Sequence, residues 1–285
     1  EHAHPITMLA VFINPLAGRV RPVRVWEAVK PMLERDGIAY KAYHLDLPPG
    51  LDDHSGILII GGDGTVHHVL NRYADTRLPI GIIPAGSGND LASTLFPGRE
   101  LGDHYRNAVR GTLRAVDAGV CNGRIFLNGV GIGFDGEVAL DIHRVKWLTG
   151  KMKYMSVVLR RIFSYREKRM RLEWEGRTLE RDIFMVSVAN GYRYGGGFHV
   201  APLADWHDGW LDVVIIDKVS VLQRLRYLPV IERGKHLDLS FVDASLARSI
   251  RISSRSLLHA HLDGELMSAS VFEISVLPSR FIFRC

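Results

Sequence analysis

Two patterns of apolar and polar positions divide the chain into a first part of about 118 residues and a remainder. In the first part, short apolar runs alternate with segments in which apolar residues recur at helical spacing. Such alternation is typical of a parallel sheet with helices on both faces, so we expect a Rossmann-like α/β domain. The pattern predicts strands at 8–13, 38–45, 57–60 and 78–83, and helices at 23–35, 66–73 and from about 89.

From residue 113 onward the pattern changes to one strand after another. This change predicts a β-sandwich domain, interrupted by helices at about 137–163 and 221–233. We therefore divide the chain into an α/β domain over residues 1–118 and a β-sandwich domain over residues 119–278. The expected strands of the second domain are 124–128, 169–175, 178–188, 211–217, 249–253, 257–262 and 270–277.

The strand at 57–60 runs directly into a glycine-rich turn, Gly61-Gly62-Asp63-Gly64-Thr65. Glycines let backbone N–H groups approach phosphate oxygens, and the following helix would direct its positive N-terminal end to the same place. The charge of Asp63 repels phosphates, so its natural role is to hold Mg²⁺, directly or through water. The turn therefore indicates a metal–triphosphate site, although Gly-Gly-Asp-Gly also forms tight turns in proteins that bind nothing.

A second glycine loop follows the strand at 78–83 and reads Pro84-Ala85-Gly86-Ser87-Gly88-Asn89-Asp90. Its Ser, Asn and Asp residues are suited to capping the helix that follows. Two such loops after neighbouring parallel strands can line one nucleotide crevice at the carboxyl ends of the strands.

Four more motifs accompany these two loops. They are Asn14-Pro15 within residues 12–18, Asn128-Gly129-Val130-Gly131-Ile132-Gly133-Phe134-Asp135, residues 195–213, and Leu262-Asp263-Gly264-Glu265. With this set, in this order, the chain resembles the diacylglycerol kinase catalytic family, which includes bacterial lipid kinases and sphingosine kinases and is distantly related to NAD kinases. The matching motifs span nearly the whole chain.

The resemblance implies transfer of the γ-phosphate of ATP to a lipid hydroxyl, with diacylglycerol as the first candidate. By position, Glu265 matches the general base of the family, and Asp63 matches the residue that organises the catalytic Mg²⁺ through water. The family's structural Mg²⁺ would fall on Asp205, Asp208 and Trp210. The positions that match its ATP loops are Asn14, Gly61, Gly62, Asp63, Gly64, Thr65, Val66, His67, Gly86, Ser87, Gly88 and Asn89.

The resemblance also implies that residues 279–285 return to the first domain, with 281–283 as a crossing strand. Glu265 would then come from the second domain and the glycine loops from the first, so the active site is expected in the cleft between them. An alternative is that residues 262–265 form only a hairpin turn, because Asp-Gly is a common hairpin dipeptide.

Composition restricts the class of protein further. With 47% hydrophobic and 24% charged residues, the chain is an ordinary globular one, and its two cysteines provide neither a disulfide framework nor a zinc site. No secretory signal and no apolar run of about 20 residues is visible. We therefore expect a cytoplasmic protein that associates peripherally with the inner face of the membrane. The oligomeric state is open, with a homodimer as one alternative.

The positive charge is concentrated in one segment. Residues 143–171 contain ten Lys/Arg and the single acid Glu167, a net +9, although the whole chain is only +5. Apolar residues are interleaved with this charge, as in a basic amphipathic helix on an anionic surface, and we expect the segment to bind anionic membrane lipid. The alternative is a solvated helix packed on its own domain. Nucleic acid is not expected as a partner, because no stacking motif or nucleic-acid fold signature accompanies the charge.

Other functions fit the sequence less well. Residues 131–136 match the dinucleotide pattern G-x-G-x-x-G, but no acid for the ribose lies between Asp141 and Glu167. Close backbone packing, or shaping of the acceptor cleft, explains these glycines better. An NAD kinase-like enzyme would carry an Asn-Glu motif, and this chain has none. A non-enzymatic nucleotide sensor is disfavoured by Asp63, Thr65 and Glu265 occurring together. A sphingoid base, ceramide or another bacterial lipid is the alternative acceptor.

Overall fold

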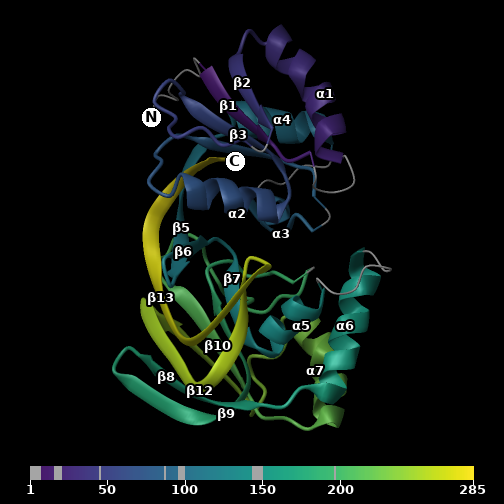
Figure 1. The fold of residues 1–285 in the computed structure, drawn as a ribbon, viewed down its shortest axis with the longest axis vertical. Helices are drawn as coiled ribbons and strands as arrows, with labels where there is room; N and C mark the ends of the chain where they lie inside the picture. The colour runs from purple at the N-terminus through teal and green to yellow at the C-terminus, as the bar shows by residue number, and fades with distance from the viewer. Residues whose placement is uncertain are drawn as a thin grey trace. The chain divides into compact units, whose positions relative to one another are not determined.

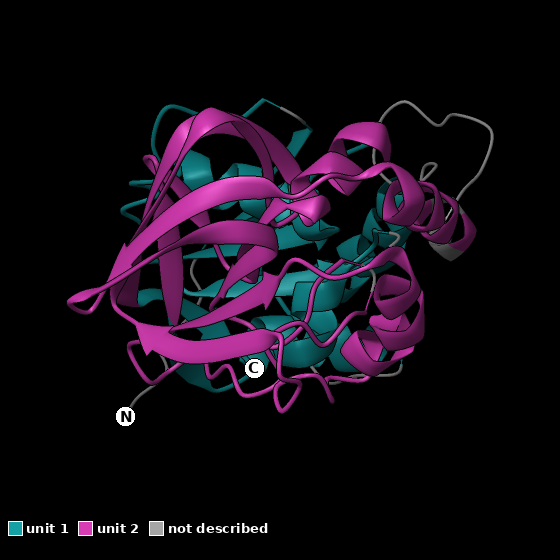
Figure 2. Cartoon of the chain, turned by 90° about the horizontal axis from the view of Figure 1, so that it is seen from below, with its two compact units in different colours: residues 1–116, 279–285 teal, residues 117–278 magenta. Residues whose placement is uncertain are grey.

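The fold was analysed in a computed structural model of the chain. The structure describes residues 8–15, 21–44, 46–86, 88–95, 100–142, 150–195 and 197–285. These residues form two compact units, one made of residues up to 116 together with 279–285, and one made of residues 117–278 (Figure 2).

A parallel sheet forms the centre of the first unit (Figure 1). Its strands lie in the order β2-β1-β3-β4, and every neighbouring pair is parallel. Fully buried aliphatic side chains, such as Leu58 and Ile60, fill its central strand. The strands are β1 (Met8–Ile13), β2 (Ala39–His44), β3 (Gly56–Gly61) and β4 (Ile80–Pro84), each at a predicted place.

Four helices accompany this sheet in the first unit. Trp26 and Tyr105, from two of these helices, belong to the same apolar core as the sheet residues. The fourth helix was not predicted, although Leu101, Tyr105, Ala108 and Val109 recur at helical spacing. The helices are α1 (Arg21–Arg35), α2 (Asp63–Arg72), α3 (Asp90–Leu95) and α4 (Leu101–Arg110).

The second unit is a β-sandwich, as the sequence pattern predicted. Its main strand order is β11-β10-β9-β7-β12-β13, while β8 pairs with both β9 and β12. The long strands β9 and β12 each pair with β7 along one half and with β8 along the other, so both contribute to both layers. The strands are β6 (Arg124–Phe126), β7 (Gly129–Gly133), β8 (Lys168–Trp174), β9 (Arg177–Ala189), β10 (Leu211–Asp217), β11 (Val242–Ala247), β12 (Ser249–Leu262) and β13 (Glu265–Arg284).

The predicted strands 249–253 and 257–262 belong to one strand, β12. The prediction of two strands was wrong because the register with β13 shifts between Ser253 and Leu258, where the chain bulges without leaving the sheet. The strand predicted at 270–277 is likewise only part of the 20-residue strand β13.

Helices α5 (Phe134–Ile142), α6 (Gly150–Ser164) and α7 (Val221–Glu232) complete the second unit. The single basic helix expected at 137–163 was wrong, because Arg161 of α6 contacts Glu137 and Asp141 of α5, which one straight helix would hold about 30 Å or more away. Residues 143–149 lie outside the described part. Ser220 caps α7 by accepting a hydrogen bond from the N–H of Gln223, as the sequence allows. In the described part of the chain, no helix is long and apolar enough to cross a bilayer.

Two strands carry the chain from one unit to the other and back. Strand β5 (Leu113–Cys121) leaves the first unit, and the last residues of β13 re-enter it. There Phe283 pairs in parallel with Ile80 of β4, and Cys285 exchanges two backbone hydrogen bonds with Thr112. The second unit is therefore inserted into the first.

Candidate functional site

The two glycine loops meet at the carboxyl edge of the first unit's sheet. Asn14 follows β1, and Gly61 and Pro84 are the paired last residues of β3 and β4. Because these strands are parallel and adjacent, all three loop starts lie at one edge of the sheet. Loops with backbone N–H groups at such an edge are suited to hold phosphates.

Contact between the loops is close enough to require glycine on both sides. A Cβ atom on Gly86 would lie 2.5 Å from the Cα of Gly62, and one on Gly62 would lie 2.8 Å from the Cα of Gly86. The Asn89 side chain fixes the second loop, accepting from the Gly86 N–H at 2.9 Å and donating to the Gly86 carbonyl at 3.0 Å. Ser87 lies outside the described residues.

Asp63 joins the two loops through its carboxylate. Its two oxygens accept the backbone N–H groups of Asp90 and Leu91, each at 3.1 Å, at the start of α3. The sequence predicted a metal-organising role for Asp63 and missed this capping role.

The other predicted nucleotide residues lie on or beside the first turn of α2. A Cβ on Gly61 would lie 2.6 Å from the Thr65 side chain, so the turn closes tightly only with glycine there. Thr65, Val66 and His67 are buried in that turn, with 8%, 2% and 7% of their surface exposed. Their side chains therefore shape the loop from within. The backbone N–H groups of Thr65 and Val66 donate to the Gly62 carbonyl, at 2.9 and 3.1 Å.

Glu265 begins β13 directly after a two-residue hairpin turn. Asp263 and Gly264 occupy the left-handed region with φ of 50° and 94°, and Leu262 pairs with Glu265 across the turn. Residues 262–265 therefore form a hairpin turn, the alternative that the Asp-Gly dipeptide suggested. The Glu265 side chain is exposed, and among the described residues it makes no hydrogen bond or ion pair. Its carboxylate is therefore available to a ligand.

Asp263, the neighbouring carboxylate of this turn, is fully engaged. It accepts backbone N–H groups from Leu127 at 2.6 Å, Asn128 at 2.8 Å and Gly129 at 3.0 Å. The sequence analysis assigned Asp263 no role of its own. Its contacts leave Glu265 as the carboxylate of the turn that can reach a substrate.

An apolar cavity lies inside the second unit, bordered by α5, α6, α7 and strands β9 and β10. Its cavity volume is about 50 Å³, so the pocket is narrow as it stands. Aromatic and branched side chains dominate its wall, including Phe134, Tyr154, Val158, Phe184, Phe198 and Ile216. The wall is therefore apolar over most of its area.

Arg224 also borders the cavity, but its guanidinium is held by the protein. It forms an ion pair with Glu167 at 2.5 Å and donates to the carbonyls of Ile162 at 2.7 Å and Tyr165 at 3.0 Å. It further stacks against the Phe184 ring at 4.9 Å. Because its charge is neutralised internally, Arg224 fixes α7 to α6 and does not make the cavity cationic.

The polar end of the cavity is formed by Asp135 and Tyr194. The Asp135 Oδ2 atom lies 3.8 Å from the His261 Nε2 atom and is buried without a hydrogen-bond partner among the described residues. Tyr194 packs edge-on against the His261 ring and donates to Ser187 at 2.7 Å. Burial raises the pKa of Tyr194 well above its usual value, so it remains a hydrogen-bond donor.

The glycines of residues 131–136 serve close packing, one of the two explanations that their sequence suggested. A Cβ on Gly131 would lie 2.5 Å from the His261 Nε2 atom and 2.7 Å from the Asp135 Oδ2 atom. A Cβ on Gly136 would lie 1.9 Å from the His259 carbonyl oxygen, because α5 crosses β12 closely there. Gly131 therefore makes space for the pair at the polar end of the cavity.

The predicted metal turn precedes β10. Asp208 accepts a hydrogen bond from the backbone N–H of Trp210 at 2.8 Å. Asp205 is exposed, and its Oδ1 atom contacts both the backbone N–H and the ring Nδ1 atom of His207, each at 3.1 Å. Burial, with a smaller effect of the charge of Asp208, raises the pKa of nearby Asp212 to about 6. Among the described residues, no group of three His, Cys, Asp or Glu side chains could hold a metal ion, so Asp205 and Asp208 do not belong to such a cluster.

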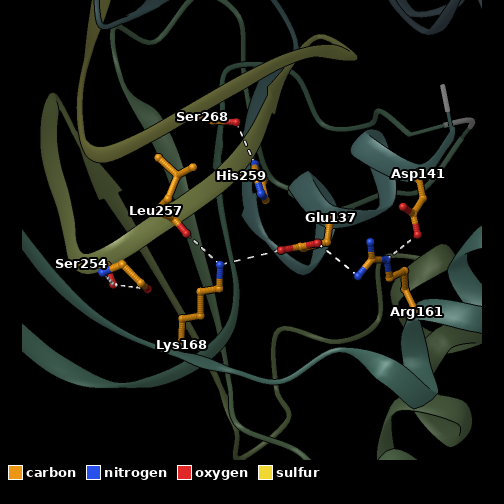
Figure 3. A network of polar contacts seen from close by, with 9 residues as sticks. Glu137, Asp141, Arg161, Lys168, Ser254, Leu257, His259 and Ser268 are labelled. Carbon is orange, nitrogen blue, oxygen red and sulfur yellow. Dashed lines mark hydrogen bonds and ion pairs between the residues drawn. The ribbon is translucent and has the colours of Figure 1, made fainter. Parts of the chain in front are cut away.

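Ion pairs neutralise part of the basic segment's charge, and Figure 3 shows those of Arg161 and Lys168. Arg161 contacts Asp141 at 2.6 Å and Glu137 at 3.2 Å, and Lys168 contacts Glu137 at 3.8 Å and donates to the Leu257 carbonyl at 2.7 Å. These contacts tie α6 and β8 to α5. Two further basic residues of the segment pair with acids on the sheet, Arg169 with Glu180 and Arg171 with Glu173.

Exposed apolar side chains on α6 add to this surface. Met152, Leu159 and Phe163 are exposed by 73%, 41% and 64%, and their spacing of seven and four residues places them on one stripe of the helix. The opposite side of α6, with Tyr154 and Val158, faces the cavity. Helix α6 thus separates the cavity from an exposed apolar surface.

Comparison with known proteins agrees with this division of the chain. Residues 8–121 match the model of the diacylglycerol kinase catalytic domain, and residues 128–282 match that of the YegS C-terminal NAD kinase beta sandwich-like domain. A diacylglycerol kinase of Mycobacterium tuberculosis is 29% identical over 97% of this chain and 94% of its own length.

Two solved structures share the fold. A diacylglycerol kinase from Bacillus anthracis is 19% identical, with a TM-score of 0.74 over 99% of this chain and 98% of its own. An NAD kinase from Archaeoglobus fulgidus, solved in complex with ATP, is 15% identical with a TM-score of 0.56 over 98% of this chain and 94% of its own. With an α/β domain of the diacylglycerol kinase type joined to a YegS-type β-sandwich, the chain belongs to the diacylglycerol kinase family of kinases.

Proposed function

We propose that this kinase transfers the γ-phosphate of ATP to a hydroxyl group of a lipid, with diacylglycerol as the first candidate. The observation that carries the proposal is the apolar cavity in the unit that also carries Glu265. A soluble acceptor such as a dinucleotide would have little use for a cavity lined by aromatic and branched side chains. A sphingoid base, ceramide or another bacterial lipid fits the same wall.

The polar end of the cavity lies close to the Glu265 turn in the sheet. Asp135 borders the cavity and faces His261, which pairs with Leu266 across the β12–β13 ladder. The next pair of that ladder is Leu262 with Glu265. A lipid with its chain in the cavity and its headgroup beside Asp135 would lie one ladder pair from Glu265, whose side chain points to the opposite face of the sheet from that of His261.

Glu265 is the proposed general base. Phosphoryl transfer requires little covalent work from a protein, so a carboxylate that orients and deprotonates the attacking hydroxyl suffices beside phosphate positioning and a metal. The glycine loops of the first unit, from Gly61 to His67 and from Gly86 to Asn89, supply the proposed phosphate contacts through backbone N–H groups.

Mg²⁺ is the proposed cofactor, and it would neutralise the charge that develops on the transferred phosphoryl group. Asp63 would hold the catalytic ion through water, beside its capping contacts to α3. The turn with Asp205, Asp208 and the Trp210 carbonyl would hold a structural ion.

Transfer of radiolabelled γ-phosphate from ATP and Mg²⁺ into a total lipid extract tests the proposal directly. A labelled lipid that chromatography identifies would support it and name the acceptor. ATP binding without label in any lipid would contradict it and favour a soluble acceptor or a nucleotide sensor.

Val158→Phe is expected to raise the KM for the lipid about tenfold, because the larger ring would fill a cavity that Val158 now borders. The KM for ATP should stay within about twofold, since the nucleotide loops belong to the other unit. Leu159→Phe is the matched control, because this neighbouring side chain is 41% exposed on the outer face of α6. Equal lipid kinetics for both variants would remove the cavity from the acceptor site.

We further propose that α6 binds the kinase peripherally to the anionic inner face of the membrane. The combined change Met152→Ser, Leu159→Ser and Phe163→Ser should weaken binding to phosphatidylglycerol vesicles about tenfold or more, because each buried CH₂ contributes about 0.8 kcal/mol. Arg160 and Arg166, which are exposed, would add a salt-sensitive attraction.

The control for this surface is Leu246→Ser with Leu257→Ser, which removes two exposed leucines from the β strands of the same unit. Vesicle sedimentation compares the two variants. If both bind as the unchanged protein does, α6 is only a solvated helix packed on its own domain.

A further inference from the structure

We infer that Asp263 is a positioning residue that holds the general base Glu265 in place. The inference rests on the proposed function, because the place of Glu265 matters for transfer only if Glu265 is the base. It assigns a separate task to each carboxylate of the turn, one for orientation and one for chemistry.

Three consecutive backbone amides converge on the Asp263 carboxylate. Its Oδ2 atom accepts from Leu127 at 2.6 Å, and its Oδ1 atom accepts from Asn128 at 2.8 Å and Gly129 at 3.0 Å. The backbone N–H of Asp263 also donates to the Gly129 carbonyl at 3.1 Å. Hydrogen bonds to a carboxylate are roughly twice as strong as neutral ones, so the three contacts to Asp263, together with the neutral backbone bond, firmly join the hairpin tip to the start of β7.

The segment that provides these amides is itself held by hydrogen bonds from the buried residue Asn190. Asn190 is fully buried, and its side-chain amide donates to the Leu127 carbonyl at 2.8 Å and to the Asp117 carbonyl at 2.9 Å. The backbone N–H of Asn190 donates to the Asn128 carbonyl at 2.9 Å. Asp263 is therefore bound to a rigid part of the sandwich.

Glu265 depends on this anchor because no side-chain contact orients it within the part of the chain that the structure describes. Its side chain is exposed and makes no polar contact with the described residues. Its backbone follows two left-handed residues at the end of a hairpin, a place where strands fray easily. A general base must lie within hydrogen-bond reach of the proton that it takes, and a misplacement of 1 Å can cost about 10²-fold in rate.

The Asp-Gly turn alone does not explain the arrangement. A type I′ hairpin forms equally well with Asn-Gly, so the turn does not need a carboxylate. A carboxylate is useful here because it accepts three amides at once, from a segment more than 130 residues earlier in the chain.

The kinetic test compares Asp263→Ala and Asp263→Asn with the unchanged kinase, using γ-labelled ATP and the lipid that the extract assay identifies. We expect kcat to fall about 10²-fold for Asp263→Ala, with the KM values for ATP and lipid within about twofold. Asp263→Asn should recover part of the loss, because its amide oxygen still accepts the two amides that reach Oδ1.

The pH profile separates positioning from base chemistry. Both variants should keep the acid limb of the kcat/KM profile at its original midpoint, because Glu265 still takes the proton. Loss of that limb in Asp263→Asn would identify Asp263 as the base and overturn the inference.

Asn122→Ala is the matched control for a purely structural role. Asn122 joins the β5–β6 turn to β13 in the same manner, accepting from Glu273 at 2.8 Å and donating to the Val271 carbonyl at 2.9 Å, but farther along the strand. We expect it to lower the Tm and leave kcat unchanged. An equal loss of kcat in Asn122→Ala, or an unchanged kcat in Asp263→Ala, contradicts the positioning role. Absence of lipid phosphorylation by the unchanged protein would overturn the proposed function itself, and this inference with it.

Discussion

Replacing Glu265 by Gln is expected to lower phosphoryl transfer to lipid by about 10²–10⁴-fold, the range typical of a lost general base. The amide has almost the shape of the carboxylate but takes up no proton. Because Glu265 has no polar partner in the described structure, the change should leave the Tm and the affinity for ATP within about twofold. Steady-state transfer and calorimetric titration with ATP measure the two quantities.

Glu273→Gln is the control for this prediction. Glu273 lies on the same strand, β13, and is exposed, but it pairs with Arg251 on the outside of the sandwich. Its loss should leave transfer unchanged. Full activity of Glu265→Gln would end the assignment of Glu265 as the base, whatever the acceptor is.

Gly86→Ala is expected to lower the affinity for ATP about tenfold or more. The new Cβ would lie 2.5 Å from the Cα of Gly62 and 2.8 Å from the Asn89 Oδ1 atom, so the two glycine loops must move apart. Overpacking of this kind typically costs about 1–3 kcal/mol, and about 1.4 kcal/mol corresponds to a factor of ten in affinity. Calorimetric titration with ATP and Mg²⁺ measures the change.

Gly102→Ala makes the same chemical change without the contact. Its Cβ would meet only the end of the Arg106 side chain, at 3.6 Å, on α4 of the same unit. ATP affinity should not change, and the helix should tolerate alanine well. If Gly86→Ala also binds ATP normally, the close approach of the loops has no part in nucleotide binding.

Local sequence patterns were sufficient where structure depends on local contacts. The parallel strands of the first unit lie where apolar runs predicted them, and helices follow both glycine loops. The meeting of the loops also followed, because parallel neighbours place their carboxyl ends at one edge. Topology thus predicted the approach of Gly62 and Gly86, but not that Asp63 would join the loops by capping α3.

Contacts between distant residues could not be read from the sequence. Asp263 binds amides of residues 127–129, and His261 meets Asp135, across more than 120 residues in each case. No spacing rule connects such positions. The charge of 143–171 shows the same limit, because the partners of Arg161 and Lys168 lie on α5 and follow from helix packing.

The packing of α6 against α5 was missed for a different reason. Arg161 meets Glu137 and Asp141 because the two helices lie side by side, and helical spacing along a segment does not predict such packing. The spacing identified helix-forming residues correctly and gave no information on how the helices pack.

The insertion of one unit into the other also sets the order in which this protein can fold during synthesis. Phe281 and Phe283 are fully buried in the first unit, and Phe283 completes the sheet beside β4. Until the ribosome has released these residues, β4 is an open sheet edge, which is a template for wrong pairing. The sandwich, whose residues are contiguous, can fold earlier. The nucleotide-binding half, although made first, is therefore finished last.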